Sequence, residues 1–403
     1  MIFYPKKENI KIALNKELEI LLSEEFDSVI KREKESFDRL AEPFEKSIVL
    51  FGSGQLGRKT LAGLRTLGIE PLAFADNNSN LWHQYIDNLI VLSPEEAADK
   101  FGDKAVFIVT IWRACSTHRL AHTREQLQRL NCQKVVSCAF LFWKYSQIFL
   151  PHYCLDLPHK VFLETENIKK AFYLLADERS QSEYLAQLRW RILLDFDNLP
   201  SPIPQEQYFR QDIFNLSPDD VFVDCGSYDG DTIKQFLKYQ NSFTGKIIAL
   251  EPDQKNFTKL EEYVYSLTSI IREKITLFPL AVGKQKERLR FAATGTASSV
   301  ITELGTIEVD CVTLDELLSN CIPSIIKMDI EGAEIDAILG AKILIQKYSP
   351  ILAISVYHCQ NHLWQIPLLI QSLSNQYRFF LSPHGEECWD LVFYAVPMSR
   401  LKL

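Results

Sequence analysis

The stretch VFVDCGSYDGDT, residues 221–232, places a glycine-rich turn and three aspartates at the end of a short apolar strand. The segment DTIKQFLKY that completes and follows it has the apolar spacing of a helix. A strand, a glycine turn and a helix in this order belong to open α/β sheets, in which ligands bind at the carboxyl ends of the strands. We therefore expect this turn to line a ligand site.

Strand–helix alternation continues from this stretch to the end of the sequence. The predicted strands are KIIALEP, KITLFPLAV, SIIKMDIEGAE and ILAISVYH, while LRFAAT and TIEVDCVTL form an additional β excursion. YRFFL and LVFYAVP have no obvious helix between them, which predicts an antiparallel hairpin at the edge of the sheet. Residues 216–403 are therefore expected to form one domain.

A similar alternation precedes this domain. In residues 46–145 the segments KSIVLF, PLAFADNN, AVFIVTIW and KVVSC are predicted strands of a parallel sheet. Residues 1–45 are predicted to be a charged amphipathic helical segment. Residues 146–215 are predicted to be a helical connector that ends in the linker LPSPIPQEQ, because clustered prolines cannot continue a helix. The predicted fold class is α/β, with two doubly wound Rossmann-like domains.

The overall composition excludes several classes of partner. The 44 basic and 52 acidic side chains give no basic footprint of the kind that nucleic-acid binders carry. The N-terminus has no apolar signal core, and no apolar run approaches the ~20 residues of a membrane helix. Nine cysteines without a C-x-x-C pair fit a reducing cytoplasm. We expect a cytoplasmic protein that acts on a small molecule or glycan; homo-oligomer formation stays open.

The first glycine loop, GSGQLG, has the spacing of a dinucleotide fingerprint. Gly52, Gly54 and Gly57 stand between a predicted strand and helix, and Asp76 ends the next strand, where an acid can bind a ribose. NAD(P) or another nucleotide is therefore one hypothesis for this domain. The other is a turn whose glycines serve helix–strand packing only. The segments VLFGSGQLG, FADNN and VLSPEEA resemble Rossmann-like domains found beside sugar-processing and glycan-modifying enzymes.

The second glycine loop has a different spacing, with Asp224, Gly226 and Gly230 in the pattern D-x-G-x-x-x-G. Asp224 and Asp229 would repel a pyrophosphate and favour a ligand with a cationic end. S-adenosylmethionine has an ammonium, a sulfonium and a free ribose diol. Glu251 ends the next strand and can accept two hydrogen bonds from that diol. Gly226 would let the chain pass close to the methionine moiety, and Gly230 would let the helix approach the sheet.

Several motifs together carry a family resemblance. Residues 219–396 resemble the FkbM family of S-adenosylmethionine-dependent methyltransferases through FVDCGSYDGDT, ALEPDQKNFTKL, FPLAVG, IIKMDIEGAE and LVFYAV. The pattern K-x-D-x-E-G-x-E is the most diagnostic of these. The resemblance implies a class I methyltransferase fold, with a seven-stranded sheet whose last hairpin is antiparallel. It also implies O-methylation of a sugar or another small polyhydroxy metabolite.

The motif KMDIEGAE places charged side chains at the carboxyl end of a predicted strand. If the run stays extended, alternation puts Lys327, Asp329 and Glu331 on one face, with Asp329 nearest to the methyl donor. Glu334 is expected to cap the turn or to pair with Lys327. We predict that the first three residues take part in catalysis and that Asp329 also contacts the cofactor. A structural acid–lysine network is the alternative.

Histidines follow the next predicted strand in SVYHCQNHLW. His358 is our candidate for the general base that removes the proton of the acceptor hydroxyl. His362 is four residues further and shares a face with His358 if a helix starts there. Together with Asp329 the two could bind a divalent cation, but H-x-x-x-H alone is a weak signal and we predict no metal. His384 is expected to be an ordinary loop histidine.

The remaining cofactor contacts are less well defined by the sequence. Tyr228 is expected near the methionine end of the cofactor, and Ala281, in the stretch 278–282 that ends the third strand, against the adenine ring. Two alternative functions stay open. One is an NAD-dependent enzyme centred on the GSGQLG domain, and the other is a non-catalytic binding scaffold. The acids at positions 224, 251 and 329 argue against the scaffold, which would not need them.

Overall fold

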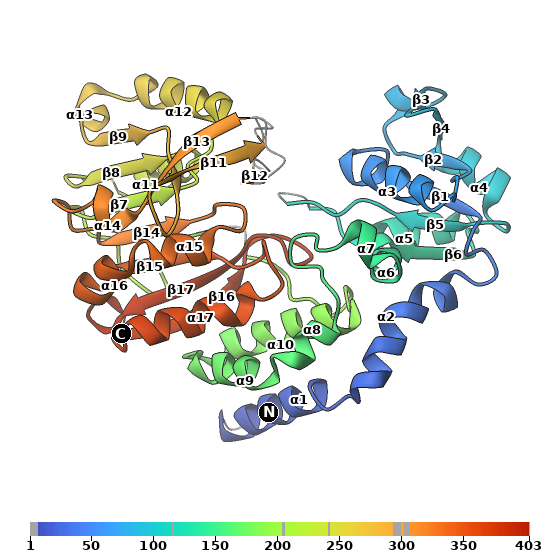
Figure 1. Cartoon of the computed structure of the whole chain (residues 1–403), viewed down its shortest axis with the longest axis horizontal. Helices are drawn as coiled ribbons and strands as arrows, with labels where there is room; N and C mark the ends of the chain where they lie inside the picture. Colours follow the sequence, from blue (N-terminus) through green and yellow to red (C-terminus); the bar gives the residue numbers. More distant parts are fainter. Residues whose placement is uncertain are drawn as a thin grey trace, which may run out of the picture. The chain divides into compact units, whose positions relative to one another are not determined.

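The computed structural model describes residues 7–114, 117–203, 206–240, 242–292, 300–301 and 307–402 (Figure 1). The chain forms two compact units. Unit 1 comprises Met1–Thr165, Ser182–Pro202 and Gly385–Asp390, and unit 2 comprises Glu166–Gln181, Ile203–His384 and Leu391–Leu403. The predicted connector, residues 146–215, thus contributes segments to both units. Pro204 in the predicted linker, residues 293–294 of LRFAAT and residue 306 of TIEVDCVTL lie outside the described residues.

Unit 1 contains a six-stranded sheet in the order β3-β4-β2-β1-β5-β6. Its strands are β1 (Ile48–Phe51), β2 (Ala73–Ala75), β3 (Tyr85–Ile86), β4 (Leu89–Leu92), β5 (Val106–Val109) and β6 (Lys134–Ser137). All neighbours pair in parallel except β3 and β4. The order reverses beside β1, so the turn after β1 lies at a topological switch point. The predicted parallel sheet is confirmed, and the sequence did not reveal the β3–β4 hairpin.

Unit 1 also contains a series of helices. They are α1 (Lys7–Leu21), α2 (Phe26–Ala41), α3 (Gln55–Thr66), η1 (Ser79–Leu81), α4 (Pro94–Phe101), α5 (Leu120–Arg129), α6 (Cys138–Lys144), α7 (Ser146–Phe149) and α8 (His159–Leu163). Ser93 and Glu96 form a capping box at the start of α4. Further along the chain come α9 (Thr165–Leu174) and α10 (Glu178–Leu193).

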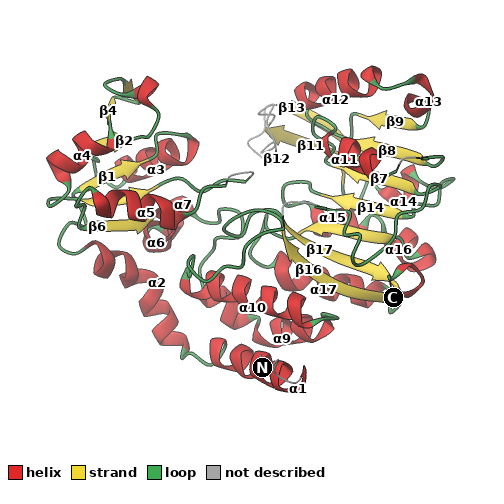
Figure 2. Cartoon of the chain, turned by 180° about the vertical axis from the view of Figure 1, so that it is seen from behind, coloured by secondary structure: helices red, strands yellow, loops and turns green. Residues whose placement is uncertain are grey.

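Unit 2 contains a seven-stranded sheet in the order β16-β17-β15-β14-β7-β8-β9 (Figure 2). Its strands are β7 (Val221–Cys225), β8 (Lys246–Leu250), β9 (Ile275–Phe278), β14 (Ile325–Met328), β15 (Ile351–Ser355), β16 (Tyr377–Pro383) and β17 (Leu391–Pro397). β17 runs antiparallel to both of its neighbours, and the other pairs are parallel. The predicted doubly wound sheet with an antiparallel edge hairpin is confirmed.

The helices of unit 2 cover both faces of this sheet, since every residue of β14 and β15 is buried. They are α11 (Asp231–Tyr239), α12 (Gln254–Ser266), α13 (Ser269–Arg272), α14 (Leu314–Leu317), α15 (Glu334–Leu339), α16 (Lys342–Tyr348), α17 (His362–Leu373) and η2 (Met398–Arg400). On one face, Phe236 of α11 and Leu260 of α12 pack with Phe222 and Ile247 of the sheet. Among the described helices none is long and apolar enough to cross a membrane.

The predicted β excursion forms a separate sheet in unit 2, in the order β10-β13-β11-β12. Its strands are β10 (Ala281–Val282), β11 (Glu287–Ala292), β12 (Val300–Ile301) and β13 (Ile307–Val312). The prediction of KITLFPLAV as one strand was wrong, because β9 ends at Phe278 and β10 pairs with β13 instead. Pro279 has no amide hydrogen for the ladder, which explains the break.

Candidate active site

The glycine turn between β7 and α11 is shaped by neighbouring backbone. Gly226 has φ +79°, and a Cβ there would lie 2.0 Å from the carbonyl oxygen of Asp329. Gly230 has φ +90°, and its Cβ would lie 2.5 Å from Cδ1 of Tyr263. Only glycine fits both positions without a shift of the chain. The close approach expected at Gly226 is therefore an approach to the backbone of Asp329 at the end of β14. It does not depend on a cofactor.

Asp224 and Lys327 form an ion pair inside the sheet. They are cross-strand partners on β7 and β14, with 3.1 Å between Nζ and Oδ1. The ammonium also donates to the carbonyl oxygen of Gly226 at 2.6 Å. Burial raises the pKa of Asp224 to about 6 against the effect of Lys327. Burial acts to lower the pKa of Lys327, but the carboxylates around it, Asp224 first, hold it above its usual value.

This pair corrects two expectations. Lys327 pairs with Asp224 and not with Glu334, while the alternative that Glu334 caps the turn is confirmed, since its Oε1 accepts the N–H of Ile330. The charge of Asp224 is already matched by a lysine, so its electrostatic attraction for a cationic ligand is smaller than the sequence suggested. Because both side chains are almost fully buried, with Asp224 at 0% exposure, the pair fixes the carboxyl ends of β7 and β14 relative to one another.

Glu251 presents a fixed carboxylate at the end of β8. Its Oε2 accepts the N–H of Tyr228 at 2.9 Å, and its Oε1 accepts the N–H of Asp253 at 2.9 Å. Each oxygen keeps a further lone pair for another donor. Burial raises the pKa of this carboxyl to about 7, against the effect of the two amides. Tyr228, at φ +48°, stands with its ring 5.4 Å from Nζ of Lys259.

Asp329, directly after β14, is surrounded by hydrogen-bond donors and a cation. Its Oδ2 accepts the phenol hydrogen of Tyr208 at 2.6 Å, and its Oδ1 accepts that of Tyr357 at 3.3 Å. Nε2 of His358 lies 3.2 Å from Oδ1. The carboxylate is thus held from three sides. The sequence had not revealed Tyr208, which stands in the predicted connector, or Tyr357, which precedes His358.

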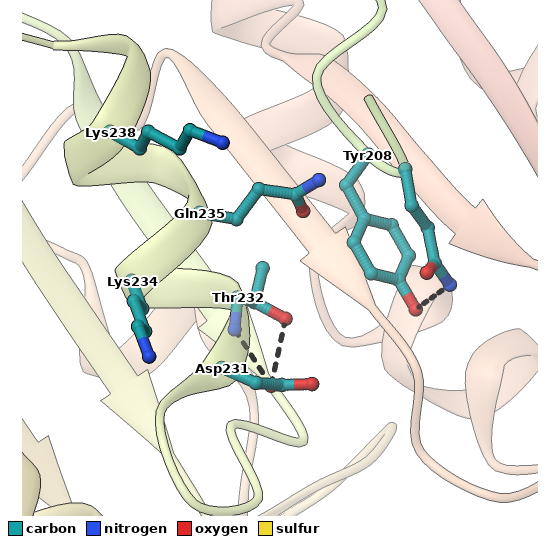
Figure 3. A pocket seen from close by; sticks show the side chains of 7 residues that line it. Tyr208, Asp231, Thr232, Lys234, Gln235 and Lys238 are labelled. Carbon is teal, nitrogen blue, oxygen red and sulfur yellow. Dashed lines mark hydrogen bonds between the residues drawn. The ribbon is translucent and has the colours of Figure 1, made fainter. Parts of the chain in front are cut away.

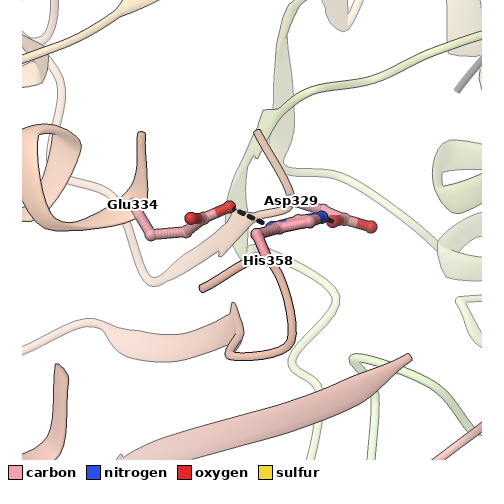
Figure 4. A group of neighbouring side chains, drawn as sticks. All are labelled: Asp329, Glu334 and His358. Atoms are coloured by element: carbon pink, nitrogen blue, oxygen red, sulfur yellow. Dashed lines mark hydrogen bonds and ion pairs between the residues drawn. The ribbon is translucent and has the colours of Figure 1, made fainter. Parts of the chain in front are cut away.

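A buried carboxylate, Glu334, organises the loop after β14 (Figure 4). It accepts a hydrogen bond from Nδ1 of His358 at 2.8 Å and from the N–H of Ile330 at 3.0 Å. Its second oxygen lies 3.3 Å from Nδ1 of His362. The imidazole of His358 stands between Glu334 and Asp329, as Figure 4 shows. Glu331, at φ +55°, lies 3.7 Å from the same ring.

Two geometric predictions for this loop were wrong. The run beyond β14 does not stay extended, because Glu331 and Gly332 both have positive φ. Lys327 and Glu331 therefore do not follow one strand face. The helix α17 begins at His362, so His358 lies before it and the two do not share a helical face. They meet instead through the two oxygens of Glu334.

The histidines of this network are expected to be cationic. Burial acts to lower the pKa of His358, but Glu334, Glu331 and Asp329 together raise it to about 10. The pKa of His362 is raised to about 9, mainly by Cys359 and Glu334 against the effect of burial. The histidines in turn lower the pKa of Glu334. His358 therefore holds its proton at neutral pH, and its role as general base stays a prediction.

Asp329, Glu334 and His358 are also a group whose ligand atoms lie close enough for a metal ion, among the residues the structure describes. The two ring nitrogens of His358 face different carboxylates. A protonated imidazole there supplies the positive charge that a cation would otherwise bring. The arrangement fits a proton-linked network, and the absence of a metal stays a prediction.

The glycine loop of unit 1 has a different construction. A Cβ on Gly57 would lie 2.0 Å from the carbonyl oxygen of Gly52, so this glycine serves helix packing, while a Cβ on Gly54 would meet no atom within 4 Å. Asp76 accepts hydrogen bonds from the N–H and the hydroxyl of Ser53, at 2.8 and 2.6 Å. Gly54 is exposed and is the N-cap residue of α3, so it alone of the three glycines meets no steric limit, and nucleotide binding stays a prediction.

Ala281, the predicted adenine contact, lies in β10 and is buried, with its strand partner at Cys311. The fold and these contacts define an open α/β unit with acids at the carboxyl ends of its strands. Residues 224–388 match the model of the methyltransferase FkbM domain. This part of the chain, which contains Asp224, Glu251 and Asp329, is therefore similar to the FkbM methyltransferase domain.

One solved structure shares the fold of this chain. The chain is similar to methyltransferase FkbM from Methylobacillus flagellatus KT, with a TM-score of 0.77 and 19% identity over 96% of this chain and 99% of that one. Precorrin-6y C5,15-methyltransferase from Geobacter metallireducens GS-15 is 11% identical over 50% of this chain and 96% of its own, with a TM-score of only 0.30. No curated protein was found to match the sequence.

Proposed function

We propose that unit 2 transfers a methyl group from S-adenosylmethionine to a hydroxyl oxygen of a sugar or another small polyhydroxy molecule. The observation that carries the proposal is Glu251. Its carboxylate is fixed by two backbone amides beside the glycine turn, and each oxygen can accept one more hydrogen bond. A ribose diol supplies two such donors at the spacing of one carboxylate.

The residues around the turn divide the work of holding the cofactor. Glu251 would bind the ribose, and the backbone at Gly226 and Tyr228 would line the methionine end. Asp224 would act chiefly through Lys327, by fixing the strand ends. When bound, S-adenosylmethionine supplies an electrophilic methyl on a sulfonium, which an acceptor oxygen attacks in line.

Asp329 is the carboxylate best placed to meet the acceptor hydroxyl. Two tyrosines and the His358 ring hold it at the end of β14. We propose that Asp329 receives or orients the hydroxyl proton, while protonated His358 balances the charge of Asp329 and Glu331. His358 acting directly as the base is the competing assignment, which requires loss of its proton from a pKa of about 10.

Calorimetric titration with S-adenosylhomocysteine tests the cofactor proposal. Wild-type protein should bind it, and Glu251→Ala should weaken binding by roughly 100-fold, because two hydrogen bonds to a charged group are lost. Glu262→Ala, an exposed acid on α12, is the matched control and should bind normally. Wild-type protein that binds neither S-adenosylmethionine nor S-adenosylhomocysteine would overturn the proposal.

A second candidate activity belongs to unit 1, where the backbone at Gly54 is exposed and an added Cβ would meet no atom within 4 Å. NAD(P) or another nucleotide is the class that fits a glycine turn at a switch point. Titration with NAD(H) tests it independently of the cofactor titration. We further propose that the protein works in a reducing cytoplasm, which agrees with the eight described cysteines forming no disulfide. Assembly into homo-oligomers remains a prediction.

A further inference from the structure

Tyr208 lies outside the residues that match the family model, yet its phenol contacts the candidate methyl-transfer site. The hydroxyl donates to Oδ2 of Asp329 at 2.6 Å. The ring centroid lies 5.2 Å from Nζ of Lys327, the cation that pairs with Asp224. One side chain thus touches the carboxylate expected next to the methyl group and covers the buried ion pair beneath it.

The backbone of Tyr208 is held in an unfavourable conformation. Tyr208 and Glu206 both have φ +67°, in the left-handed region that non-glycine residues rarely adopt. Such conformations persist where the surroundings enforce them, and they gather at functional sites. The side chain is only 4% exposed and packs into the core cluster of unit 2. Tyr208, at the end of the predicted connector, is therefore anchored in the core of unit 2.

A directed chain of hydrogen bonds holds this segment in place. The N–H of Tyr208 donates to the hydroxyl oxygen of Tyr394, and that hydroxyl donates to Nε2 of His384 at 2.6 Å. Nδ1 of His384 donates to the carbonyl oxygen of Ile203 at 2.6 Å, which assigns the tautomer. Burial lowers the pKa of His384 to about 4, so the neutral ring keeps both roles at physiological pH. His384 thus connects the backbone of Ile203 with the hydroxyl group that accepts the Tyr208 N–H.

The phenol of Tyr208 also borders a surface cavity of unit 2. The cavity has a volume of about 350 Å³ and is lined by Gln207, Tyr208, Asp231, Thr232, Lys234, Gln235 and Lys238 (Figure 3). The side-chain amide of Gln207 donates to the phenol oxygen at 3.1 Å. That oxygen is therefore shared between the cavity lining and Asp329, and it marks where the cavity meets the catalytic end of the sheet.

We propose that Tyr208 is a positioning residue of the methyl-transfer site, which sets the orientation of Asp329 toward the sulfonium and separates the site from the cavity. The inference rests on the proposed function, since it assumes that Asp329 faces the sulfonium. The phenol is suited to this role because its hydrogen bond to Asp329 is short and its hydroxyl is neutral. The backbone N–H of Tyr208 is itself held by a hydrogen bond to Tyr394. A histidine or lysine there would add charge beside Lys327.

The test compares two ligands that differ in charge at the reacting atom. S-adenosylmethionine carries a sulfonium, and S-adenosylhomocysteine carries a neutral thioether at the same place. Calorimetric dissociation constants for both ligands are measured on wild type, Tyr208→Phe and the control Tyr239→Phe, a partly buried phenol packed against the same core. Tyr208→Phe should weaken S-adenosylmethionine by about tenfold and S-adenosylhomocysteine by less than about twofold.

A second variant separates positioning from folding. Tyr394→Phe removes the acceptor for the Tyr208 N–H and leaves the phenol in place, so it should change the ratio of the two constants in the same direction by about threefold. Equal weakening of both ligands by Tyr208→Phe, or no change, would show a structural role or none and overturn the inference alone. Wild-type protein that binds neither ligand would overturn the proposed function, and this inference with it.

Discussion

Each unit has a glycine turn after a strand at its topological switch point, and the two turns are built differently. In unit 2, Gly226 and Gly230 both have positive φ, and added Cβ atoms would clash with Asp329 and Tyr263. In unit 1, added Cβ atoms at Gly52 and Gly57 would also clash with neighbouring atoms, but one at Gly54 would meet no atom within 4 Å. A glycine that is required by contacts within the chain says little about a ligand. A glycine that no such contact requires is a better indication of a ligand.

The acids beside the two turns show the opposite contrast. Asp76 in unit 1 accepts three hydrogen bonds from Ser53 and Asn78, which leaves it little capacity. Glu251 in unit 2 accepts two and is buried at the mouth of the turn. In unit 2 the residue that points to a ligand is therefore the acid, Glu251. In unit 1 it is the glycine, Gly54.

The largest effect should come from breaking the buried pair that distinguishes unit 2. Lys327→Met leaves Asp224 buried and without its cation, which should destabilise unit 2 by roughly 3–5 kcal/mol. The double variant Asp224→Leu/Lys327→Met should recover much of that loss. Calorimetry gives the transition temperatures, and hydrogen exchange of β7 and β14 peptides assigns them to unit 2. A single variant as stable as wild type would show that the pair is not formed.

Gly226→Ala should be the next most damaging change. It forces a side chain into left-handed backbone and against the carbonyl oxygen of Asp329, at a cost of about 3 kcal/mol or more. Urea unfolding followed by hydrogen exchange in unit 2 measures the loss. Gly68→Ala in unit 1, at φ +71° with no neighbour within 4 Å, is the control for backbone strain without a clash. Equal losses for both variants would assign the whole effect to φ.

Alkaline pH should lower the stability of unit 2 more than that of unit 1, because their buried histidines have different pKa values. The pKa of His358 is raised to about 10 and that of His362 to about 9, so their stabilisation is complete below pH 6.5 and is lost as pH rises toward 9–10. Each should contribute a slope of about −1.4 kcal/mol per pH unit in that window. In unit 1 burial lowers the pKa of His152 to about 3, so it is neutral throughout this window and adds no such slope.

The variant His358→Gln checks this assignment. Between pH 7 and 9 the unfolding free energy of unit 2 should fall less steeply with pH than in wild type, by the slope that corresponds to about one proton. The unfolding of unit 1 should be unchanged. The measurement is urea unfolding at several pH values, read by hydrogen exchange in each unit. A wild-type curve with no alkaline decline would mean that His358 is neutral, which would restore it as the direct general base.

The sequence predicted the sheet of unit 2 well because its signals are local. Apolar strands, helical spacing and the absence of a helix before LVFYAVP all act within a few residues. That the acids at the ends of the strands lie at one edge of the sheet could be predicted from the order of the strands, since parallel strands bring their carboxyl ends to the same edge. Asp224, Glu251 and Asp329 could therefore be named in advance, although the partner of Asp224 could not.

What the sequence could not show depends on contacts between distant segments. The Tyr208–Asp329 hydrogen bond joins residues 121 positions apart, and nothing near Tyr208 indicates it except an aromatic pair after a proline cluster. The partners of Glu334 depended on Glu331 and Gly332 leaving the extended conformation. The split of KITLFPLAV had a readable signal, because a proline inside a strand pattern favours a break.

The smallest effect on stability, and the sharpest test of the comparison, is expected from Gly54→Ala. Its φ of −71° suits any residue and its Cβ would enter open space, so the free energy of unfolding should change by less than about 0.5 kcal/mol. If a nucleotide lies against this backbone, the same methyl group should weaken NAD(H) or UDP binding strongly. Calorimetric titration of wild type and variant with both ligands decides. A wild type that binds neither would leave Gly54 without a ligand as well as without a packing role, and the contrast between the two turns would then rest on unit 2 alone.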